Sequence, residues 1–441
     1  MNLFTLYLQR AKTRSLTSLL RRSASVFKRY GNDPDKFTAY IEGFADLLSS
    51  YGVNPTFPVP GAIVEKYPDL FKRFQDRGVE FAAHGLVHID YSMLNEEKFS
   101  VHLDKINEIF DKNGILCVGF RFPFFRKSRK FKKILSESGF LWDSSDVVSF
   151  PIDESKFGKK DVSNYRRIVE SYKPLTYNRV SIVPSITDGL VELPAVVPDD
   201  DILIERLGID SADDPRLEIW LQMLRKINEH SGLMVLQAHP ERFLEFKEPL
   251  TRLIDEAVTD KSIWVTSMNK VAQWWKDRSR CKVYLQKDGR SRYRIIVKGD
   301  KRITVLIKNL NTSRNDILYK PVYSPVKDTT FVIKCKKKPI IGIHPGTDTE
   351  YKKYLSDQGF VWEESVQNEN YCLYFREYRE FKENDKLKII SEIEKCPDQL
   401  VRIWKWPEGK RSAFTVTGDI DGLTRQEIWM RNYGKRRKYK T

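Results

Sequence analysis

Two aspartates late in the chain and two histidines early in it are the side chains best suited to hold a metal ion. Asp419 and Asp421 follow the apolar run "RSAFTVTG", with one residue between them. Alternating positions of an extended chain face the same side, so both carboxylates can point at one object. His84 and His88, in "FAAHGLVHID", also follow a strand-like run. On a helical turn, this H-x-x-x-H spacing places both imidazoles on one side.

Two histidines need a third ligand before they form a metal site, and a catalytic site also keeps an open position for water. If Asp421 completes the set with His84 and His88, Asp419 is left beside the ion as a base. Two histidines and one carboxylate also occur in non-haem iron oxygenases, so hydrolysis and oxygen chemistry both stay open at this point.

The segments around these residues alternate between strand and helix patterns from residue 54 to about 275. Strands are predicted at 55–61, 79–85, 115–123, 140–145, 190–195, 233–240 and 262–267. Helices are predicted at 62–78, 95–114, 129–139, 215–232 and 249–258. This order indicates βαβ units and a mostly parallel sheet. It predicts an α/β fold: a distorted or incomplete (β/α) barrel of about seven strands, with the site at the carboxyl ends of the strands.

From about residue 281 the pattern changes to short β-like segments separated by turns, followed by two helices. We expect residues 281–400 to form an inserted smaller α+β domain of unknown role. Residues 1–280 would be the N-terminal part of the catalytic domain. Residues 401–441 would complete it with a strand, the aspartate pair and a basic tail.

The ordered motifs of the chain resemble those of the polysaccharide deacetylase superfamily (carbohydrate esterase family 4, with the chitooligosaccharide deacetylase homology domain). The matching segments are "GVNPTFPVPG", "HGLVH" with the following "IDYSML", "GFRFP", "FLWDSS", "LQAHP" and "TGDID". They cover roughly residues 30–275 and 404–424. The ordered set is much more specific than any single motif.

Two features depart from the family pattern. The aspartate motif comes first in the usual member but last here, which we interpret as a circular permutation that places "AFTVTGD" beside "PTFPV". Chain termini of domains often lie close together, so such a rearrangement is tolerable. Phe124 stands where the family usually has tyrosine, which puts one substrate-side hydroxyl in doubt.

The resemblance implies a role for each matched residue. His84, His88 and Asp421 would bind a divalent metal, zinc before cobalt, manganese, nickel or iron. Asp419 would be the general base and Arg121 would fix its ionised state. His239 would be the general acid that protonates the departing amine, since histidine can give a proton near neutral pH. Asp143 would orient an acid or the arginine.

The implied activity is a metal-dependent hydrolase that removes an N-acyl group, acetyl above all, from a sugar, glycan or lipid-linked sugar. The alternatives are a hydrolase of another non-peptide C–N bond and a non-catalytic protein that binds glycan or membrane. The net charge of +16 favours an anionic partner. No recognisable module supports nucleic-acid binding. The sequence does not reveal the oligomeric state.

The location is predicted from what the chain contains. The five cysteines are scattered, which argues against a disulfide framework and favours a reducing compartment. No apolar stretch reaches the roughly 20 residues that cross a bilayer. The acid-free segment 1–30 has its basic residues after its apolar run, unlike a secretory signal. We expect a cytoplasmic protein, or one whose basic amphipathic N-terminal helix contacts the inner membrane surface; docking on the protein's own core and an organellar transit peptide are the alternatives.

Overall fold

The structure is a computed structural model that describes residues 26–128, 130–177, 182–209, 211, 213–310, 323–326 and 328–428. Most of the predicted N-terminal helix and the basic tail lie outside these residues. Where the N-terminal segment is described, Val26 and Tyr30 are buried in the main core. Among the described residues, no helix combines the length and apolar character needed to cross a bilayer.

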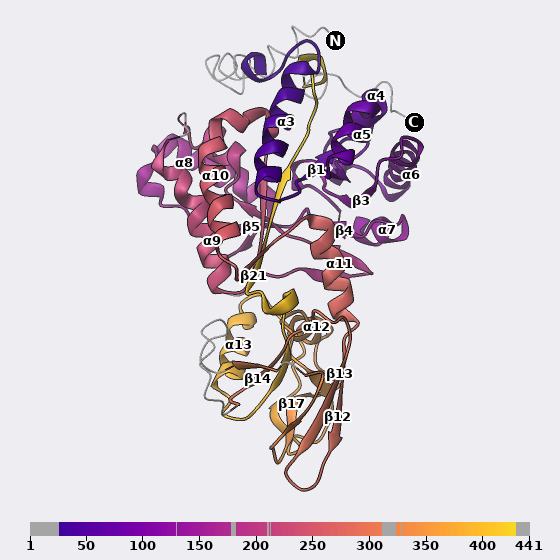
Figure 1. Cartoon of the computed structure of the whole chain (residues 1–441), viewed down its shortest axis with the longest axis vertical. Coiled ribbons are helices and arrows are strands. Elements are labelled where there is room, and N and C mark those ends of the chain that lie inside the picture. The colour runs from indigo at the N-terminus through magenta and orange to yellow at the C-terminus, as the bar shows by residue number, and fades with distance from the viewer. Residues whose placement is uncertain are drawn as a thin grey trace.

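The molecule has a larger part and a smaller part, arranged along its longest axis (Figure 1). Twelve strands form one sheet in the larger part, in the order β6-β5-β9-β10-β21-β1-β2-β3-β4-β8-β7, with β11 also paired to β21. All pairs are parallel except β7 with β8. The strands are β1 (Thr56–Val59), β2 (Glu80–Ala83), β3 (Cys117–Phe120), β4 (Trp142–Asp143), β5 (Val147–Ser149), β6 (Leu175–Thr176), β7 (Ser185–Thr187), β8 (Leu190–Glu192), β9 (Ala195–Val197), β10 (Leu233–Ala238), β11 (Ile263–Val265) and β21 (Ser412–Gly418).

Strand β21 comes last in the chain but lies in the middle of this sheet. It pairs in register with the whole of β10, from Leu233 opposite Ala413 to Ala238 opposite Gly418. On its other side it pairs with β11 at its start and with β1 at Thr417. All seven of its residues are buried, as expected for a central strand of a parallel sheet covered on both faces.

Helices surround the sheet (Figure 1). They are α3 (Asp35–Ser50), α4 (Gly61–Lys66), α5 (Pro68–Asp76), α6 (Glu96–Lys112), α7 (Phe131–Glu137), α8 (Lys159–Tyr172), α9 (Ile219–Glu229), α10 (Phe243–Thr259) and α11 (Met268–Ser279). The side chain of Asn95 accepts a hydrogen bond from the backbone N–H of Lys98, which caps α6 as its sequence predicts. One continuous apolar core joins sheet and helices.

The α/β class and the strand–helix alternation are confirmed, but the sheet has more strands than the predicted seven. The added strands are mostly two or three residues long, between residues 142 and 197. Strands this short carry too few residues for a periodic pattern to show. The predicted helix 62–78 is two helices, because Pro68 removes a backbone donor and begins a second helix.

The smaller part contains three three-stranded sheets, with orders β12-β13-β16, β15-β14-β20 and β18-β17-β19. Their strands are β12 (Lys282–Lys287), β13 (Tyr293–Lys298), β14 (Val305–Lys308), β15 (Tyr323–Val326), β16 (Thr330–Ile333), β17 (Lys338–Ile343), β18 (Trp362–Glu364), β19 (Tyr371–Phe375) and β20 (Val401–Ile403). Helices α12 (Thr349–Asp357) and α13 (Asp385–Lys395) accompany them. Two further apolar clusters lie in this part. The core of the large sheet also reaches it, through Leu306 of β14 and Tyr323 of β15.

Candidate active site

The predicted site residues follow the ends of adjacent parallel strands. His84 follows β2, Arg121 follows β3, His239 follows β10 and Asp419 follows β21. Backbone hydrogen bonds extend the sheet just beyond the strands: the N–H of Arg121 donates to the Ala83 carbonyl, and that of Asp419 to the Ala238 carbonyl, each at 2.9 Å. Since parallel strands end at the same edge of a sheet, these side chains lie together.

The histidine pair converges on Asp421. The Nε2 atoms of His88 and His84 lie 2.9 and 3.5 Å from Asp421 Oδ1. His84 Nδ1 lies 2.8 Å from the carbonyl oxygen of Arg121. A carbonyl can only accept, so Nδ1 of His84 carries the proton and Nε2 presents a lone pair. Two imidazole nitrogens and a carboxylate oxygen within 4.8 Å of one another are a donor set that fits a divalent metal ion.

The loop that carries the two histidines is not the predicted helical turn. It has bends rather than helix, and Gly85 has a φ of +78°. A Cβ on Gly85 would lie 2.5 Å from the ring of Tyr91, which is too close for any other residue. The Tyr91 hydroxyl accepts a hydrogen bond from the N–H of Leu86 at 2.7 Å. A glycine turn fixed by a buried tyrosine therefore brings the histidines together.

Arg121 holds Asp419 in place from the middle of the sheet. Its Nη1 donates to Asp419 Oδ1 at 2.6 Å and to Thr417 Oγ1 at 2.8 Å. The other Asp419 oxygen accepts from Gln237 Nε2 at 3.1 Å. Arg121 is itself fixed by the backbone carbonyl and hydroxyl of Ser144, at 3.0 and 2.9 Å. Arg121 is completely buried, so this charge-assisted pair fixes the position of the Asp419 carboxylate away from solvent.

His239 is paired with an acid that the sequence analysis did not identify. Its Nδ1 lies 2.9 Å from Oδ1 of the fully buried Asp200. Burial alone would lower the pKa of His239, but the attraction of Asp200, with smaller contributions from Glu241 and Asp421, outweighs it. The pKa of His239 is therefore well above its ordinary value, and the imidazolium is stable at neutral pH.

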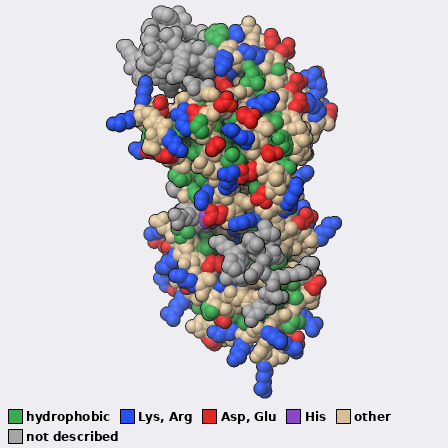
Figure 2. Space-filling model, turned by 60° about the vertical axis from the view of Figure 1, so that its left-hand side comes forward, with side chains coloured by type: hydrophobic (Ala, Val, Ile, Leu, Met, Phe, Trp, Pro, Cys, Tyr) green, Lys and Arg blue, Asp and Glu red, His purple; other side chains and the backbone are tan. Residues whose placement is uncertain are grey.

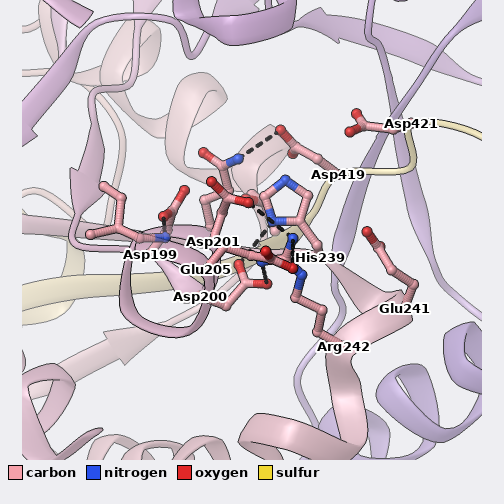
Figure 3. Close-up of polar contacts among 12 residues, drawn as sticks. Asp199, Asp200, Asp201, Glu205, His239, Glu241, Arg242, Asp419 and Asp421 are labelled. Atoms are coloured by element: carbon pink, nitrogen blue, oxygen red, sulfur yellow. Dashed lines mark hydrogen bonds and ion pairs between the residues drawn. The ribbon is translucent and has the colours of Figure 1, made fainter. Parts of the chain in front are cut away.

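Further charged residues surround this pair (Figure 3). Arg242 Nη2 lies 2.9 Å from Asp201 and 3.4 Å from Glu205. Burial raises the pKa of Asp199 to about 7, together with the negative charges of the neighbouring Asp200 and Asp201. Asp199, Asp200 and His239 also bring ligand-type atoms within 4.8 Å of one another. Because His239 Nδ1 is already hydrogen-bonded to Asp200, we interpret this group as support for the histidine.

A pocket of about 300 Å³ opens above both groups. Its lining includes the two histidines, both aspartates of the "DID" pair, His239 and Gln237. Phe124 also lines it, with its ring 4.5 Å from that of His88 in an edge-to-face arrangement. Residues from distant parts of the chain line it together, Arg29 and Tyr30 from one and Ile428 from the other. Gly31 and Thr424, which lie close to them in sequence, make a backbone bridge.

Asp143 has other partners than those expected. Lys127 Nζ lies 2.7 Å from Asp143 Oδ2, and the Ser145 hydroxyl donates to Oδ1. Among the contacts of the described residues, none joins Asp143 to Arg121 or His239. The geometry gives those tasks to Ser144, which fixes the arginine, and to Asp200, which contacts the histidine.

The sequence analysis did not identify Gln237 and Asp200 as site residues, although the segments that contain them carry a signal. Gln237 lies two residues before His239 in "LQAHP", so alternation alone places both on one side of the chain. Asp200 lies in the run "PDDD", which follows β9. Three acids after a buried strand were a usable signal. Which of them meets His239 depends on the tertiary fold.

Part of the chain is similar to a known protein family. Residues 31–141 match the family model described as polysaccharide deacetylase. The peptidoglycan deacetylase-like protein FGM2 of Gibberella zeae is 34% identical over 91 residues, which are 20% of this chain and 27% of that protein. The chain thus spans about a quarter of the length of this relative.

Two solved structures also resemble the chain. A protein of Mycobacterium smegmatis assigned as a polysaccharide deacetylase matches with 23% identity and a TM-score of 0.41, over 53% of this chain and 76% of that one. The allantoinase PuuE matches with 16% identity and a TM-score of 0.41, over 54% and 72%. The family match agrees with the resemblance predicted from the sequence, over residues 31–141.

Proposed function

We propose that this protein is a metal-dependent hydrolase that removes the acetyl group from an N-acetylated sugar or glycan. The observation that carries the proposal is the convergence of His84, His88 and Asp421 beside an Asp419 that Arg121 holds. The family match of residues 31–141 supports the substrate class. Hydrolysis fits better than oxygen chemistry, because the second aspartate and the histidine acid flank the ligand set as a base and an acid.

His84, His88 and Asp421 would hold the ion. A zinc ion, or a similar divalent ion, would polarise the acyl oxygen and make water more acidic. Asp419 is placed to take the proton of the attacking water, because its carboxylate lies within 4.0 Å of the ligand His84. Arg121 and Gln237 bind one oxygen each, which fixes the orientation of the carboxylate before the reaction begins.

The departing amine nitrogen needs a proton before the C–N bond breaks. His239 is placed to give it from Nε2, because Asp200 occupies Nδ1. The raised pKa of His239 keeps it charged at neutral pH. A hydrolysis of this kind requires a group that can give a proton to the leaving amine, and the charged His239 is such a group.

Zinc content and acetate release from N-acetylglucosamine oligomers, measured on the same samples, test the proposal. Asp421→Asn and His84→Ala should lose both zinc and activity. Asp419→Asn should keep zinc and lose about 10²–10⁴-fold in turnover, since a base can be removed without removing the ion. Asp90→Asn, which alters another carboxylate of the pocket lining, should keep zinc and most activity.

Two results would contradict this assignment. If Asp419→Asn strips the zinc while Asp421→Asn keeps it, the roles within the pair are reversed. If the zinc-loaded protein releases acetate from no N-acetylated sugar, deacetylation is wrong although the metal site stands.

We infer further that the motif order reflects a circular permutation. The position of β21 between β10 and β1 supports this, as does the bridge between Gly31 and Thr424. A rearranged chain in which residues 404–428 are linked in front of residue 26 should then fold and bind zinc. An aggregated or zinc-free product would count against the inference, provided that the unaltered chain binds zinc under the same conditions.

A further inference from the structure

One strongly positive stretch lies between the two ends of the chain. Residues 282–338 contain sixteen lysines and arginines but four acids, a net charge of +12. The stretch forms β12 to β16 and the start of β17, in the smaller part of the molecule. Figure 2 shows many Lys and Arg side chains at the lower end of the molecule, where Figure 1 labels β12 and β13.

The sheet β12-β13-β16 has one covered face and one open face. Tyr293, Ile295 and Val297 of β13 are buried in an apolar core, while the alternate residues Arg294 and Lys298 are exposed. On β12, Lys282, Tyr284 and Gln286 are exposed in the same alternation. We call the side chains of Lys282, Tyr284, Gln286, Arg294, Lys298 and Val332 the cationic face.

The register places like charges opposite one another on this face. Lys282 pairs with Lys298 across β12 and β13. Like charges directly opposite in a sheet are unfavourable, so neither lysine is there to stabilise the fold. Among the described residues, no carboxylate lies within 4.0 Å of Lys282, Arg294 or Lys298.

Protection of a sheet edge is the other common use of exposed lysines. It accounts for Lys282, because β12 is an edge strand. It does not account for Arg294 and Lys298, because β13 is the central strand and both of its edges are already paired. These two cations lie on the open face of the sheet, and β13 has no unpaired edge that they could protect.

Apolar groups lie among the cations. Tyr284 is 43% exposed and Val332 is 48% exposed. Lys298 Nζ lies 5.6 Å from the centre of the Tyr284 ring. An exposed aromatic ring beside unneutralised cations suits a ligand that has both a flat apolar surface and negative charge. A sugar ring that bears a carboxylate or a phosphate is such a ligand.

We propose that the cationic face binds an anionic polysaccharide, and that it holds the polymer while the catalytic site acts on it. The cations bind the acidic groups, and Tyr284 packs against a sugar ring. The choice of a glycan as the ligand rests on the proposed function. The charge and the geometry of the face are observations that do not depend on the proposed function.

Binding of the purified full chain to polygalacturonate, measured by titration calorimetry at several salt concentrations, tests the proposal. Neutral dextran is the uncharged comparison, and a single-stranded oligonucleotide represents another class of polyanion. The double variant Lys282→Gln/Lys298→Gln should bind polygalacturonate more weakly, with a salt slope lower by about one for each lysine removed. Tyr284→Ala should weaken binding and leave the salt slope unchanged.

The matched control is Lys159→Gln/Lys160→Gln, which removes the same charge from exposed positions at the start of α8 in the catalytic part. It should bind polygalacturonate as the unaltered chain does. Equal weakening in this control would overturn the proposal, because net charge alone would then explain binding. So would unchanged binding by the Lys282/Lys298 variant, or tighter binding of the oligonucleotide with the same dependence on these lysines.

The outcome is separable from the proposed activity. The Lys282/Lys298 variant should release acetate from short N-acetylglucosamine oligomers at the unaltered rate, because these lysines lie outside the pocket. If the unaltered chain binds polygalacturonate through this face yet deacetylates nothing, the proposed function fails and the binding surface stands. If the chain deacetylates the oligomers but does not bind polygalacturonate, this proposal alone fails.

Discussion

Charged residues are arranged differently at the candidate site of the catalytic part (residues 26–279 and 412–428) and on the cationic face of the β-rich part (residues 282–403). The first buries charges and pairs them, as in Arg121 with Asp419 and Lys127 with Asp143. The second leaves Arg294 and Lys298 exposed on a central strand without an acidic neighbour. A buried charge must be compensated inside the fold. An exposed, uncompensated one remains available for a partner. This difference in charge pairing distinguishes the candidate reaction site from the proposed binding surface.

The largest effect is expected from losing β21. A chain that ends at residue 410 should fail to unfold cooperatively and should not bind zinc, because β1 and β10 each lose a neighbouring strand and β11 loses the strand with which it pairs. A chain that ends at residue 428 keeps every described residue and should behave as the full chain. Circular dichroism during thermal unfolding and zinc content measure both. Zinc binding by the shorter chain would contradict the assignment of the metal site, because that chain lacks Asp419 and Asp421.

A smaller loss is expected from a lysine of the catalytic part. Lys127 lies 2.7, 3.0 and 3.1 Å from Asp143, Asp146 and Glu192. Burial opposes its charge, but these three acids together raise its pKa above the ordinary value. Lys127→Gln should lower the free energy of unfolding by about 3–5 kcal/mol, the usual cost of leaving buried charge unpaired. Chemical denaturation measures this change, and a loss under about 1 kcal/mol would contradict the pairing argument.

The next effect is a shift in pH dependence without loss of fold. His239 must be protonated to give its proton, so turnover falls as the pH rises through the pKa of His239. Asp200→Asn removes the main attraction that opposes burial, so the pKa of His239 falls. The alkaline limb of kcat should therefore move to lower pH. Asp90→Asn should leave the limb in place, and an unmoved limb in Asp200→Asn would argue against this acid–histidine pair.

The smallest effect completes the comparison with the same substitution in the β-rich part. Lys298→Gln should leave the free energy of unfolding unchanged or raise it by about 0.2–1 kcal/mol, because it removes the charge opposite Lys282. Chemical denaturation beside Lys127→Gln is the measurement. A destabilisation as large as that of Lys127→Gln would mean that Lys298 has a partner within the fold.

The sequence was sufficient for the parts of this fold that are long or periodic. Helix α6, with Asn95 as its cap, and the strand at 412–418 could be predicted because many residues repeat one pattern. Short strands such as β5 and β9 could not, since two or three residues contain no period. The alternation of strands and helices also predicted the edge at which the site lies, because parallel strands share their carboxyl end.

Within the site, the sequence indicated which residues take part, but it did not indicate which side chains they contact. Asp421 could be matched to the histidines because few side chains bind metal ions. Asp143 was predicted to orient an acid or the arginine, but that position is filled by Asp200 and Ser144. The "PDDD" run and the "WDSS" run contain equivalent carboxylates, and only the path of the chain decides which of them reaches His239.

The cysteines are another case in which the sequence did not predict a contact between side chains. Their spacing gave no reason to pair them, yet Cys335 and Cys372 lie with their sulfur atoms 3.2 Å apart. They come from residues 37 positions apart, on a segment after β16 and on β19. Sequence spacing reports only local proximity, whereas this contact depends on how two sheets pack.

The position of β21 has a consequence for the order in which the molecule can be made. The other eleven strands of the sheet precede it in the chain, so a growing chain has β1 and β10 without their shared neighbour until residue 418 has been synthesised. During that time two apolar strand edges are unpaired, and such edges invite pairing with other chains. Closing the sheet joins residues hundreds of positions apart, and long-range pairings of this kind fold slowly. Because Asp419 and Asp421 follow the same strand, the candidate site is among the last features of the protein to form during synthesis, and a chain that ends before residue 419 lacks both of these carboxylates.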